Sequence, residues 1–593
     1  MTTTRPLTRV VVVGNGMVGS RFVDDLLSRD GTGDTARFDV TVLGAEEYDP
    51  YNRVLLSDVV AGKVDVASLA LPALTHERAT VHRGTSVVHI DRADRRVLTA
   101  DGAVHPYDAL VLATGSAARV PDVDGIGTGG PLPAGVHALR TLDDAREIVA
   151  ATVNARTAVV VGAGVLGLEA ACGLARRGLA VTVVHGGATV MDRQLAPDAG
   201  AVAARTLTHL GVAQRTGART ERVVLGAGRA AAVEVALADG TTETLPADLV
   251  VLACGTVPET AAAVAAGLPV DRGVVVTAAL ASPADARVFA VGDCAQPPEG
   301  ATGLIAQGWD QSRRLAEHLA AGAAGAAGVA ADGADDDHVG GRVRLAGERL
   351  SPGRPSMALR LSMNVVTRPA AETAPVASIG ASGTADPTVR PTQADDEASR
   401  GTDVVRLKAA GLDVVTMGVC GARRTPQPGA RTVSLSDPDA GRHVEVVVAD
   451  GFVVGATCVG APQLGADLTA AYTRRTPVPA DPAHLLVQPV ATATVAASDP
   501  THMPDRTTVC RCNGVSKGDI VGCWQHGARS VEDIAKATRA TTGCGGCKDL
   551  VCGIADWLTA STPAEEPDAP LLVEPDDVVA LHESHRGNVK VLD

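Results

Sequence analysis

Aromatic side chains are scarce in this sequence, since Phe, Trp and Tyr together make up 2% of its residues. The buried cores must therefore be filled mainly by Val, Leu and Ala. No apolar run reaches the roughly 18 residues that a membrane-spanning helix needs, and residues 1–9 are too short and too polar for a secretory signal. These absences predict a cytoplasmic protein with no membrane partner.

Clustered positive charge is also missing. The formal net charge is −15, and no basic stripe offers the Lys and Arg side chains that would neutralise phosphates. We therefore expect no nucleic-acid partner. A chain of 593 residues is too long for a single hydrophobic core, so we expect about three or four domains.

The most informative stretch is a glycine-rich turn near the start of the chain. Valines 10–13 predict a buried parallel strand, and apolar residues at helical spacing follow the turn. Gly14 permits a tight turn, Gly16 lets the backbone approach a pyrophosphate, and Gly19 lets helix and strand pack closely. A strand before these glycines and a helix after them predict a dinucleotide site.

The same pattern recurs at residues 158–169, with Gly162, Gly164 and Gly167 in the corresponding positions. An ordinary glycine turn would not be expected to repeat in its full context of strand, turn and helix. The chain therefore carries two predicted dinucleotide sites.

The residues that follow the second strand of each unit bear on the choice of nucleotide. In the first unit, Glu46 or Glu47 stands where an acid would bind a ribose. In the second unit, His185 occupies the place where an acid would have selected NADH, and no arginine follows closely. The choice between NADH and NADPH stays open, with a slight preference for NADH.

Three later strands also end in residues typical of cofactor sites. Thr114-Gly115 and Gly255 each follow a buried apolar strand and let the backbone pass close to a ligand. Asp293 follows another strand, at the carboxyl end where open α/β sheets bind ligands. Because this last strand returns the chain to its first domain, that domain is predicted to be discontinuous.

On these motifs, residues 1 to about 320 resemble the glutathione-reductase-like flavoprotein reductases, an α/β class with two Rossmann-like dinucleotide-binding domains. The resemblance implies FAD contacts from Gly14, Gly16, Gly19, Glu46, Arg53, Val87, Thr114, Gly115 and Asp293. It implies that the NAD(P)H site is lined by Gly162, Gly164, Gly167, Glu169 and Gly255.

The segment Tyr51-Asn52-Arg53-Val54-Leu55-Leu56-Ser57 narrows this resemblance. It is similar to the Tyr-Asn-Arg-x-x-Leu-Ser motif of nitrite reductase large subunits and of the electron-transfer subunit of assimilatory nitrate reductase. Many members of the wider superfamily carry a lysine after the serine. Here that residue is Asp58, so a role for such a lysine near the flavin does not transfer.

The second informative stretch pairs Cys510-x-Cys512 with Cys544-x-x-Cys547. Capping-box patterns at Ser516 and Ser530 predict two helices that fold the second pair back onto the first. Disulfides suit a cytoplasmic chain poorly, and zinc usually takes Cys-x-x-Cys at both ends. Four thiolates in a glycine-rich setting favour a [2Fe–2S] or [4Fe–4S] centre.

This cysteine spacing resembles the bacterioferritin-associated ferredoxin family, which implies a [2Fe–2S] cluster in a small helical domain. Cys523 and Cys552 fall outside the pattern and are expected to be packed thiols. No Cys-x-x-x-x-Cys follows the first glycine turn, so disulfide reductase chemistry is not expected. A sirohaem site would need a further cysteine quartet, and the remaining cysteines of this sequence are scattered. We therefore expect that the chain does not itself reduce nitrite.

The expected domain layout is as follows: an FAD domain at 1–150 and 256–320, an NAD(P)H domain at 151–255, a low-complexity linker or insertion at 321–401, a small α+β interface domain at 402–485, the [2Fe–2S] domain at 505–560, and a tail at 561–593. In the α+β domain, Asp450-Gly451 predicts the turn of a hairpin, and Cys420 and Cys458 are expected in the core.

The resemblance implies that NAD(P)H reduces FAD, that FAD supplies the cluster with single electrons, and that the cluster feeds an assimilatory nitrate reductase catalytic subunit. No acid or base side chain is required, so none is named. Three alternatives stay open: the reductase part of a split nitrite reductase, a subunit of an amine or opine dehydrogenase, and a non-catalytic redox or iron-handling module. The oligomeric state also stays open, with a homo-oligomer as one option.

Overall fold

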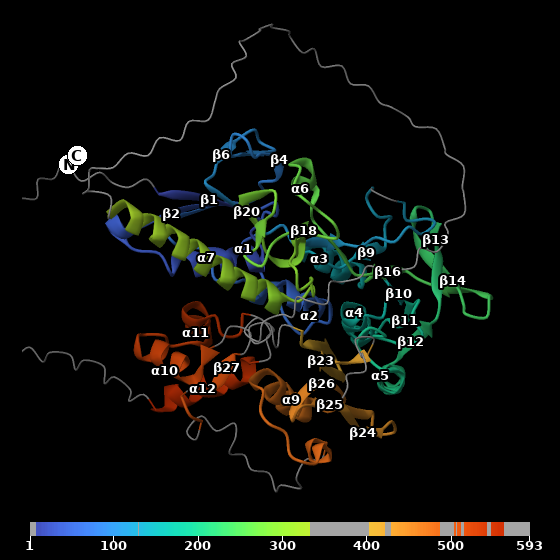
Figure 1. Cartoon of the computed structure of the whole chain (residues 1–593). Helices are drawn as coiled ribbons and strands as arrows, with labels where there is room; N and C mark the ends of the chain where they lie inside the picture. Colours follow the sequence, from blue (N-terminus) through green and yellow to red (C-terminus); the bar gives the residue numbers. More distant parts are fainter. Residues whose placement is uncertain are drawn as a thin grey trace, which may run out of the picture.

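The computed structural model describes residues 7–127, 130–331, 403–421, 429–486, 503–505, 507–510, 515–542 and 547–561 (Figure 1). Two Rossmann-like α/β domains form the first half of the chain. An antiparallel α+β domain and a small, mostly helical domain follow them. The expected fold class is confirmed. The predicted linker lies outside the described residues, except that the helix before it continues to Ala331.

The first domain is built on a six-stranded sheet. Its strands, in spatial order, are β19 (Ala281–Ser282), β20 (Asp285–Ala290), β7 (Ala109–Leu112), β1 (Thr8–Val13), β2 (Phe38–Leu43) and β3 (Ala79–His82). All pairs are parallel except β19 with β20. Because β20 comes from beyond the second domain, two separate parts of the chain assemble this sheet. The helices α1 (Met17–Leu27) and α7 (Ile305–Ala331) pack against each other beside it (Figure 1).

The four valines of β1 illustrate why this strand is central. Val10, Val11 and Val12 are no more than 1% exposed, and Val13 is 6% exposed. Helices cover parallel sheets on both faces, so a continuous apolar run suits such a strand better than alternation.

The second domain holds a five-stranded parallel sheet and a smaller antiparallel one. The parallel order is β12 (Val212–Thr216), β11 (Ala180–His185), β10 (Thr157–Val161), β16 (Leu249–Leu252) and β9 (Val136–Ala138). The antiparallel order is β13 (Arg219–Gly226), β14 (Arg229–Ala236) and β15 (Thr242–Pro246). Since β9 precedes residue 151, the second sheet begins earlier than the boundary drawn from the sequence. The strand β9 has three residues, which is too short for its pattern of apolar and polar residues to show which sheet it joins.

The α+β domain is a five-stranded antiparallel sheet in the order β22 (Val405–Ala409), β23 (Leu412–Gly418), β26 (Phe452–Val459), β25 (Arg442–Ala449) and β24 (Arg431–Asp437). Helix α9 (Pro462–Arg474) packs against it. The predicted hairpin is confirmed: Asp450 and Gly451 have φ values of 52° and 79°, the left-handed pair that a two-residue turn requires. Cys420 and Cys458 are buried, as expected.

The last domain contains a two-stranded ribbon and three helices: β27 (Thr508–Cys510), β28 (Val515–Ser516), α10 (Lys517–Gln525), α11 (Val531–Thr538) and α12 (Lys548–Ser561). Both predicted helix starts are confirmed. The Ser516 hydroxyl accepts a hydrogen bond from the Asp519 N–H, and the Ser530 hydroxyl accepts one from the Asp533 N–H.

Candidate functional site

The first glycine turn has a backbone that only glycine fits at two positions. Gly14 has a φ of +116°, and a Cβ there would lie 2.1 Å from the Ala113 carbonyl oxygen. A Cβ on Gly19 would lie 2.0 Å from the carbonyl oxygen of Gly14. At Gly16, by contrast, a Cβ would meet nothing within 4 Å. The chain therefore needs the outer glycines for packing, and the middle one leaves the backbone open to a ligand.

The second turn repeats this geometry. Gly162 has a φ of +111°, and a Cβ there would lie 2.3 Å from the Ala253 carbonyl oxygen. A Cβ on Gly167 would lie 1.9 Å from the Gly162 carbonyl oxygen, and Gly164 again has open space. The middle glycine of each turn caps the helix that follows, α1 or α4 (Val165–Arg176), and no side chain caps either one. Uncapped N–H groups beside an open backbone suit a pyrophosphate.

Side chains of the Tyr-Asn-Arg motif hold the predicted ribose ligand Glu46. The Arg53 guanidinium donates to one Glu46 oxygen at 2.5 Å, and the Tyr51 hydroxyl donates to the other at 2.7 Å. Tyr51 in turn accepts a hydrogen bond from the Leu142 N–H at 3.0 Å, and burial raises the pKa of its phenol. The Glu46 side chain remains 37% exposed, so its carboxylate is oriented without being closed off.

Arg140 is a site residue that the sequence reasoning missed. Its guanidinium donates to an Asp293 carboxylate oxygen at 2.7 Å, and the Ser116 hydroxyl donates to the same oxygen at 2.8 Å. The Arg140 carbonyl accepts a hydrogen bond from Arg53 at 3.0 Å. Arg140 therefore joins two of the predicted FAD ligands. The only sequence signal for Arg140 is its position directly before Thr141, which caps helix α3 (Leu142–Ala151).

The remaining predicted FAD and nucleotide residues lie on three segments. The Thr114 hydroxyl donates a hydrogen bond to the Glu259 carbonyl oxygen at 2.6 Å, and the Gly115 carbonyl oxygen accepts one from the Glu259 N–H at 2.9 Å. Glu259 follows Gly255 by four residues, so the strand ends of the two nucleotide domains meet here. Val87 lies on β4 (Val87–Asp91) and packs against the core of the first domain.

The structure places Glu169 where three domains meet. It lies on α4 and is 8% exposed. One of its oxygens accepts from the Ser57 hydroxyl at 2.6 Å, and the other accepts from the Lys408 N–H of the α+β domain at 2.9 Å. Burial raises the pKa of this carboxyl. Asp58, the residue in place of the lysine of many relatives, pairs with Lys63 at 3.1 Å.

A carboxylate does stand near the end of the second strand of the second domain. His185 Nδ1 accepts a hydrogen bond from the Ala163 N–H at 3.4 Å, and His185 Nε2 lies 3.2 Å from a carboxylate oxygen of Asp192. Because Nδ1 accepts, Nε2 carries the proton that faces Asp192. The Asp192 side chain is 42% exposed, so it can still meet a ligand.

Two of the four predicted cluster cysteines can be described. Cys510 and Cys547 are buried in the same hydrophobic core of the last domain, and the Thr541 N–H donates to the Cys547 sulfur at 3.3 Å. Two buried thiols in one core, with an N–H aimed at one sulfur, fit thiolate ligands of an iron–sulfur centre. Cys512 and Cys544 lie outside the described residues.

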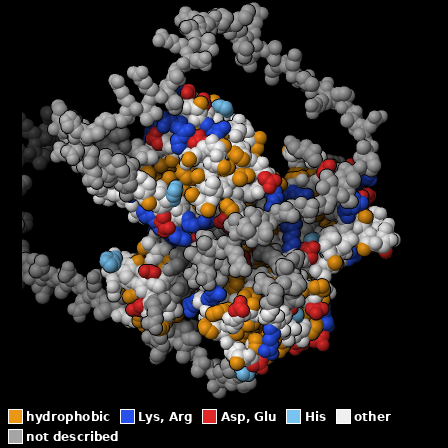
Figure 2. Space-filling model, viewed as in Figure 1, with side chains coloured by type: hydrophobic (Ala, Val, Ile, Leu, Met, Phe, Trp, Pro, Cys, Tyr) orange, Lys and Arg blue, Asp and Glu red, His pale blue; other side chains and the backbone are white. Residues whose placement is uncertain are grey.

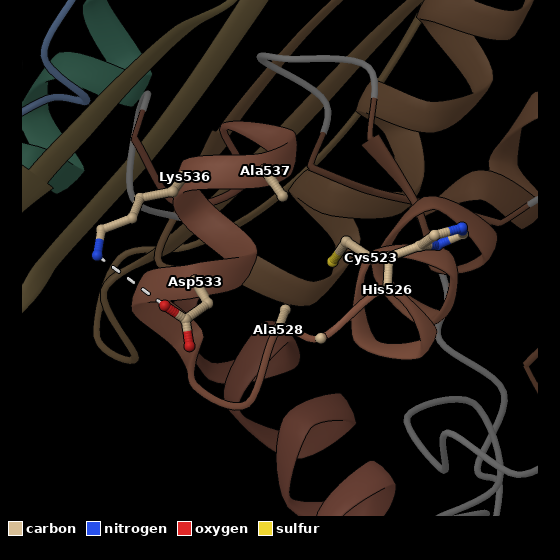
Figure 3. Close-up of a pocket in the computed structure, with 7 residues that line it drawn as sticks. Cys523, His526, Ala528, Asp533, Lys536 and Ala537 are labelled. Atoms are coloured by element: carbon tan, nitrogen blue, oxygen red, sulfur yellow. Dashed lines mark ion pairs between the residues drawn. The ribbon is translucent and has the colours of Figure 1, made fainter. Parts of the chain in front are cut away.

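A shallow pocket of about 400 Å³ opens on the same domain (Figure 3). Its lining includes Cys523 and His526 from α10 and its end, and Asp533 and Lys536 from α11. Of the two predicted cluster cysteines within the described residues, Cys510 and Cys547, neither is among the residues that line it. Cys523, expected to be packed, is only partly buried, and so is Cys552 on α12.

On the face shown in Figure 2, basic side chains gather in several small groups, and acidic side chains lie among and between them. Within the described ranges, no helix combines the length and the apolar character needed to cross a bilayer.

Comparison with known families decides the classification of the first half. Residues 8–318 match the pyridine nucleotide-disulphide oxidoreductase family. The chain belongs to this family. Residues 508–556 match the BFD-like [2Fe-2S] binding domain, which includes all four predicted cluster cysteines. The cofactors of this combination are FAD, NAD(P)H and a [2Fe–2S] cluster, as expected from the sequence.

Three curated relatives show how far the likeness extends. The nitrite reductase [NAD(P)H] of Bacillus subtilis is 28% identical over 549 residues, which are 92% of this chain and 57% of the relative. The assimilatory nitrate reductase electron transfer subunit of the same species is 26% identical over 568 residues, or 94% and 61% of the two chains. Rhodocoxin reductase of Rhodococcus erythropolis is 36% identical over 320 residues, or 52% and 71%. The expected resemblance is confirmed, and the chain spans about three fifths of the two Bacillus relatives.

Two solved structures share the fold. The covalent putidaredoxin reductase–putidaredoxin complex has a TM-score of 0.59 and 23% identity, and the match covers 82% of this chain and 97% of that one. The NAD-dependent persulfide reductase from A. fulgidus has a TM-score of 0.57 and 21% identity, with 79% and 77% covered. At these identities the likeness is one of architecture.

Proposed function

We propose that this protein is an NAD(P)H-dependent flavoprotein reductase that supplies electrons through its [2Fe–2S] domain to the catalytic subunit of an assimilatory nitrate reductase. The observation that carries the proposal is the combination of two glycine turns of equal geometry with a cysteine-bearing domain that contacts the domain of the first turn through Asp24 and Asn52. The similarity to the Bacillus electron transfer subunit, which runs through all of these parts, supports it.

The residues of the first domain would hold FAD. The open backbone at Gly16 would face the pyrophosphate, and Glu46, which Tyr51 and Arg53 hold in place, would accept hydrogen bonds from the ribose hydroxyls. Asp293, fixed by Arg140, stands at the carboxyl end of β20. Bound FAD supplies the chemistry that joins a two-electron donor to a one-electron acceptor.

The residues of the second domain would hold the nicotinamide nucleotide. The open backbone at Gly164 would face its pyrophosphate, and Gly255, which follows the neighbouring strand β16, would line the site. The Asp192 carboxylate beside His185 favours the ribose hydroxyls of NADH over the phosphate of NADPH. Glu169 fixes this domain to its neighbours through Ser57 and Lys408.

The α+β domain would serve as an interface between the other parts. It reaches the second domain through the Lys408 N–H on Glu169 and through an ion pair between Arg205 and Asp439 at 2.7 Å. Its described residues, 403–421 and 429–486, contain neither a cysteine pair nor a glycine turn of the kinds described above. Packing and domain contact therefore account for the interactions seen.

A reconstitution experiment tests the proposal. The purified protein is mixed anaerobically with NADH and a purified nitrate reductase catalytic subunit, and loss of nitrate is followed. We expect NADH-dependent nitrate loss that disappears in Cys510→Ala and Cys547→Ala. Nitrate that stays constant while the same mixture reduces ferricyanide would overturn the choice of partner.

A second candidate is the reductase part of a split nitrite reductase. The observation that favours it is the similarity to the Bacillus nitrite reductase over 92% of this chain. Replacing the nitrate enzyme by a chain that carries sirohaem, and following nitrite instead of nitrate, separates the two candidates.

A further inference from the structure

The loop at residues 539–542 ends α11 in a conformation that its sequence does not favour. Arg539 and Thr541 have φ values of 62° and 69°, in the left-handed region, although neither is glycine. Side chains rarely adopt this region, so contacts made by the loop must hold it there. We call this segment the junction loop.

The inner side of the junction loop touches a predicted cluster ligand. The N–H of Thr541 donates to the Cys547 sulfur at 3.3 Å. The intervening Ala540 is fully buried in the core that also contains Cys510 and Cys547. N–H groups that point at ligand sulfurs are among the groups that set the reduction potential of an iron–sulfur centre.

The outer side of the same loop touches the FAD domain at two points. The Arg539 guanidinium forms an ion pair with Asp24 of α1, and the arginine side chain is 18% exposed. The Thr542 carbonyl accepts a hydrogen bond from the Asn52 side-chain nitrogen at 3.0 Å. Both contacts involve residues outside the nucleotide turns and outside the cluster motif.

Asn52 is suited to this contact because both ends of its amide are used. Its side chain is 2% exposed, and its oxygen accepts the Val54 N–H at 3.1 Å while its nitrogen donates to Thr542. A carboxylate could replace the first interaction but not the second. Asn52 is the middle residue of the motif whose other members hold Glu46.

We propose that Asn52 and Asp24 are positioning residues that dock the junction loop on the FAD domain and thereby keep the Thr541 N–H on the Cys547 sulfur. The contact that brings the two domains together and the contact that tunes the cluster then belong to one loop of four residues. This inference rests on the proposed function, because it assigns the route by which the FAD domain meets the cluster.

The inference predicts a change in the cluster rather than in the flavin. A hydrogen bond to sulfur favours the reduced, more negative cluster, so a displaced junction loop lowers the midpoint potential. In Asn52→Asp the carboxylate keeps the Val54 contact, loses the donor and faces the Thr542 carbonyl. Asp24→Asn removes the charge that pairs with Arg539, at a side chain that is 40% exposed.

The test uses the intact holoprotein. The cluster potential is measured by EPR during a mediated redox titration, and stopped-flow absorbance follows flavin and cluster reduction by NADH. We expect a lower potential in both variants and cluster reduction slowed about tenfold, which corresponds to the loss of one good hydrogen bond, with flavin reduction unchanged. Lys536→Ala is the matched control. It removes a cation whose side chain is 70% exposed on α11, the helix that the junction loop follows.

Wild-type potential and wild-type cluster reduction in both variants, with full iron content, would overturn the inference. If Asn52→Asp does not fold, Asp24→Asn at the helix surface carries the test alone. The mediated titration needs no NADH. A wild-type cluster that NADH never reduces would therefore count against the proposed function, while the comparison of potentials would still decide the role of the junction loop.

Discussion

The two glycine turns are nearly identical in backbone and different in surroundings. In both, the outer glycines are required by carbonyl oxygens about 2 Å from where a Cβ would lie, and the middle glycine is open. Beyond the turns, Tyr51 and Arg53 fix a glutamate in the first domain, and a histidine–aspartate pair stands in the second. The backbone geometry suited to a pyrophosphate is thus repeated, whereas the side chains around the two turns differ.

The neighbours of the two domains differ as well. The first domain touches the junction loop of the iron–sulfur domain through Asp24 and Asn52. The second touches the α+β domain through Glu169 and Arg205. Under the proposed function, the first domain would pass electrons to the cluster and the second would bind the nicotinamide nucleotide.

The largest expected effect comes from an outer glycine of each turn. In Gly19→Ala the new Cβ meets the Gly14 oxygen, and in Gly167→Ala it meets the Gly162 oxygen. We expect the first variant to purify without flavin, because its cradle cannot form. We expect the second to stay yellow and not to be bleached by NADH. Visible spectra recorded before and after addition of NADH check both expectations. A Gly167→Ala protein without flavin would contradict the proposal that the first turn serves FAD and the second turn serves NAD(P)H.

A middle glycine should produce a smaller and cleaner effect. At Gly164 a Cβ meets no protein atom within 4 Å, so Gly164→Ala should fold normally and obstruct only the nucleotide. We expect the Kd for NADH to rise roughly tenfold or more, while flavin content stays complete. Stopped-flow titration measures this Kd. An unchanged Kd would place the pyrophosphate elsewhere.

The side chains near the second turn should affect nucleotide choice more modestly. Asp192→Asn removes the charge that disfavours a 2′-phosphate, so the ratio of kcat/KM for NADH to that for NADPH should fall severalfold. The matched control is Asp239→Asn, which changes an exposed carboxylate on another turn of the same domain. A ratio that falls equally in both variants would mean that general charge, rather than the His185–Asp192 pair, sets the preference.

The smallest effect is expected from the buried thiols of the two nucleotide domains. Burial raises the pKa of Cys172 in the second domain to about 11, and it raises the pKa of Cys294 in the first. A raised pKa keeps each thiol protonated at pH 8, and the thiolate appears only as the pH rises through the shifted value. Iodoacetamide at pH 8 should therefore leave both unmodified in the native protein and modify both after unfolding, as mass spectrometry would show. Rapid labelling of Cys294 in the native protein would contradict the expectation that the first domain has no reactive thiol for disulfide reductase chemistry.

The parts of the fold and site that the sequence predicted are local in the chain. Gly14 and Gly162 stand directly between a buried strand and a helix, and Ser516 and Ser530 stand directly before the helices they cap. Such signals lie within a few residues of the feature they predict. The strand β9 was missed because three residues carry no usable periodicity.

The contacts that the sequence could not predict join distant parts of the chain. Asn52 and Thr542 are 490 positions apart, and Glu169 and Lys408 are 239 apart. Arg140 is an isolated arginine whose role depends on where Asp293 lies after folding. No local pattern marks such pairs, since only the packing of whole domains brings them together.

The most direct test of the account is an anaerobic titration of the purified protein with NADH, followed by visible absorbance and then by EPR of the reduced form. The account predicts that flavin absorbance is bleached and that a reduced [2Fe–2S] signal appears with it. It also predicts that Gly164→Ala needs more NADH to reach the same end point. A colourless protein, or a bleached flavin beside a cluster that stays oxidised, would contradict it.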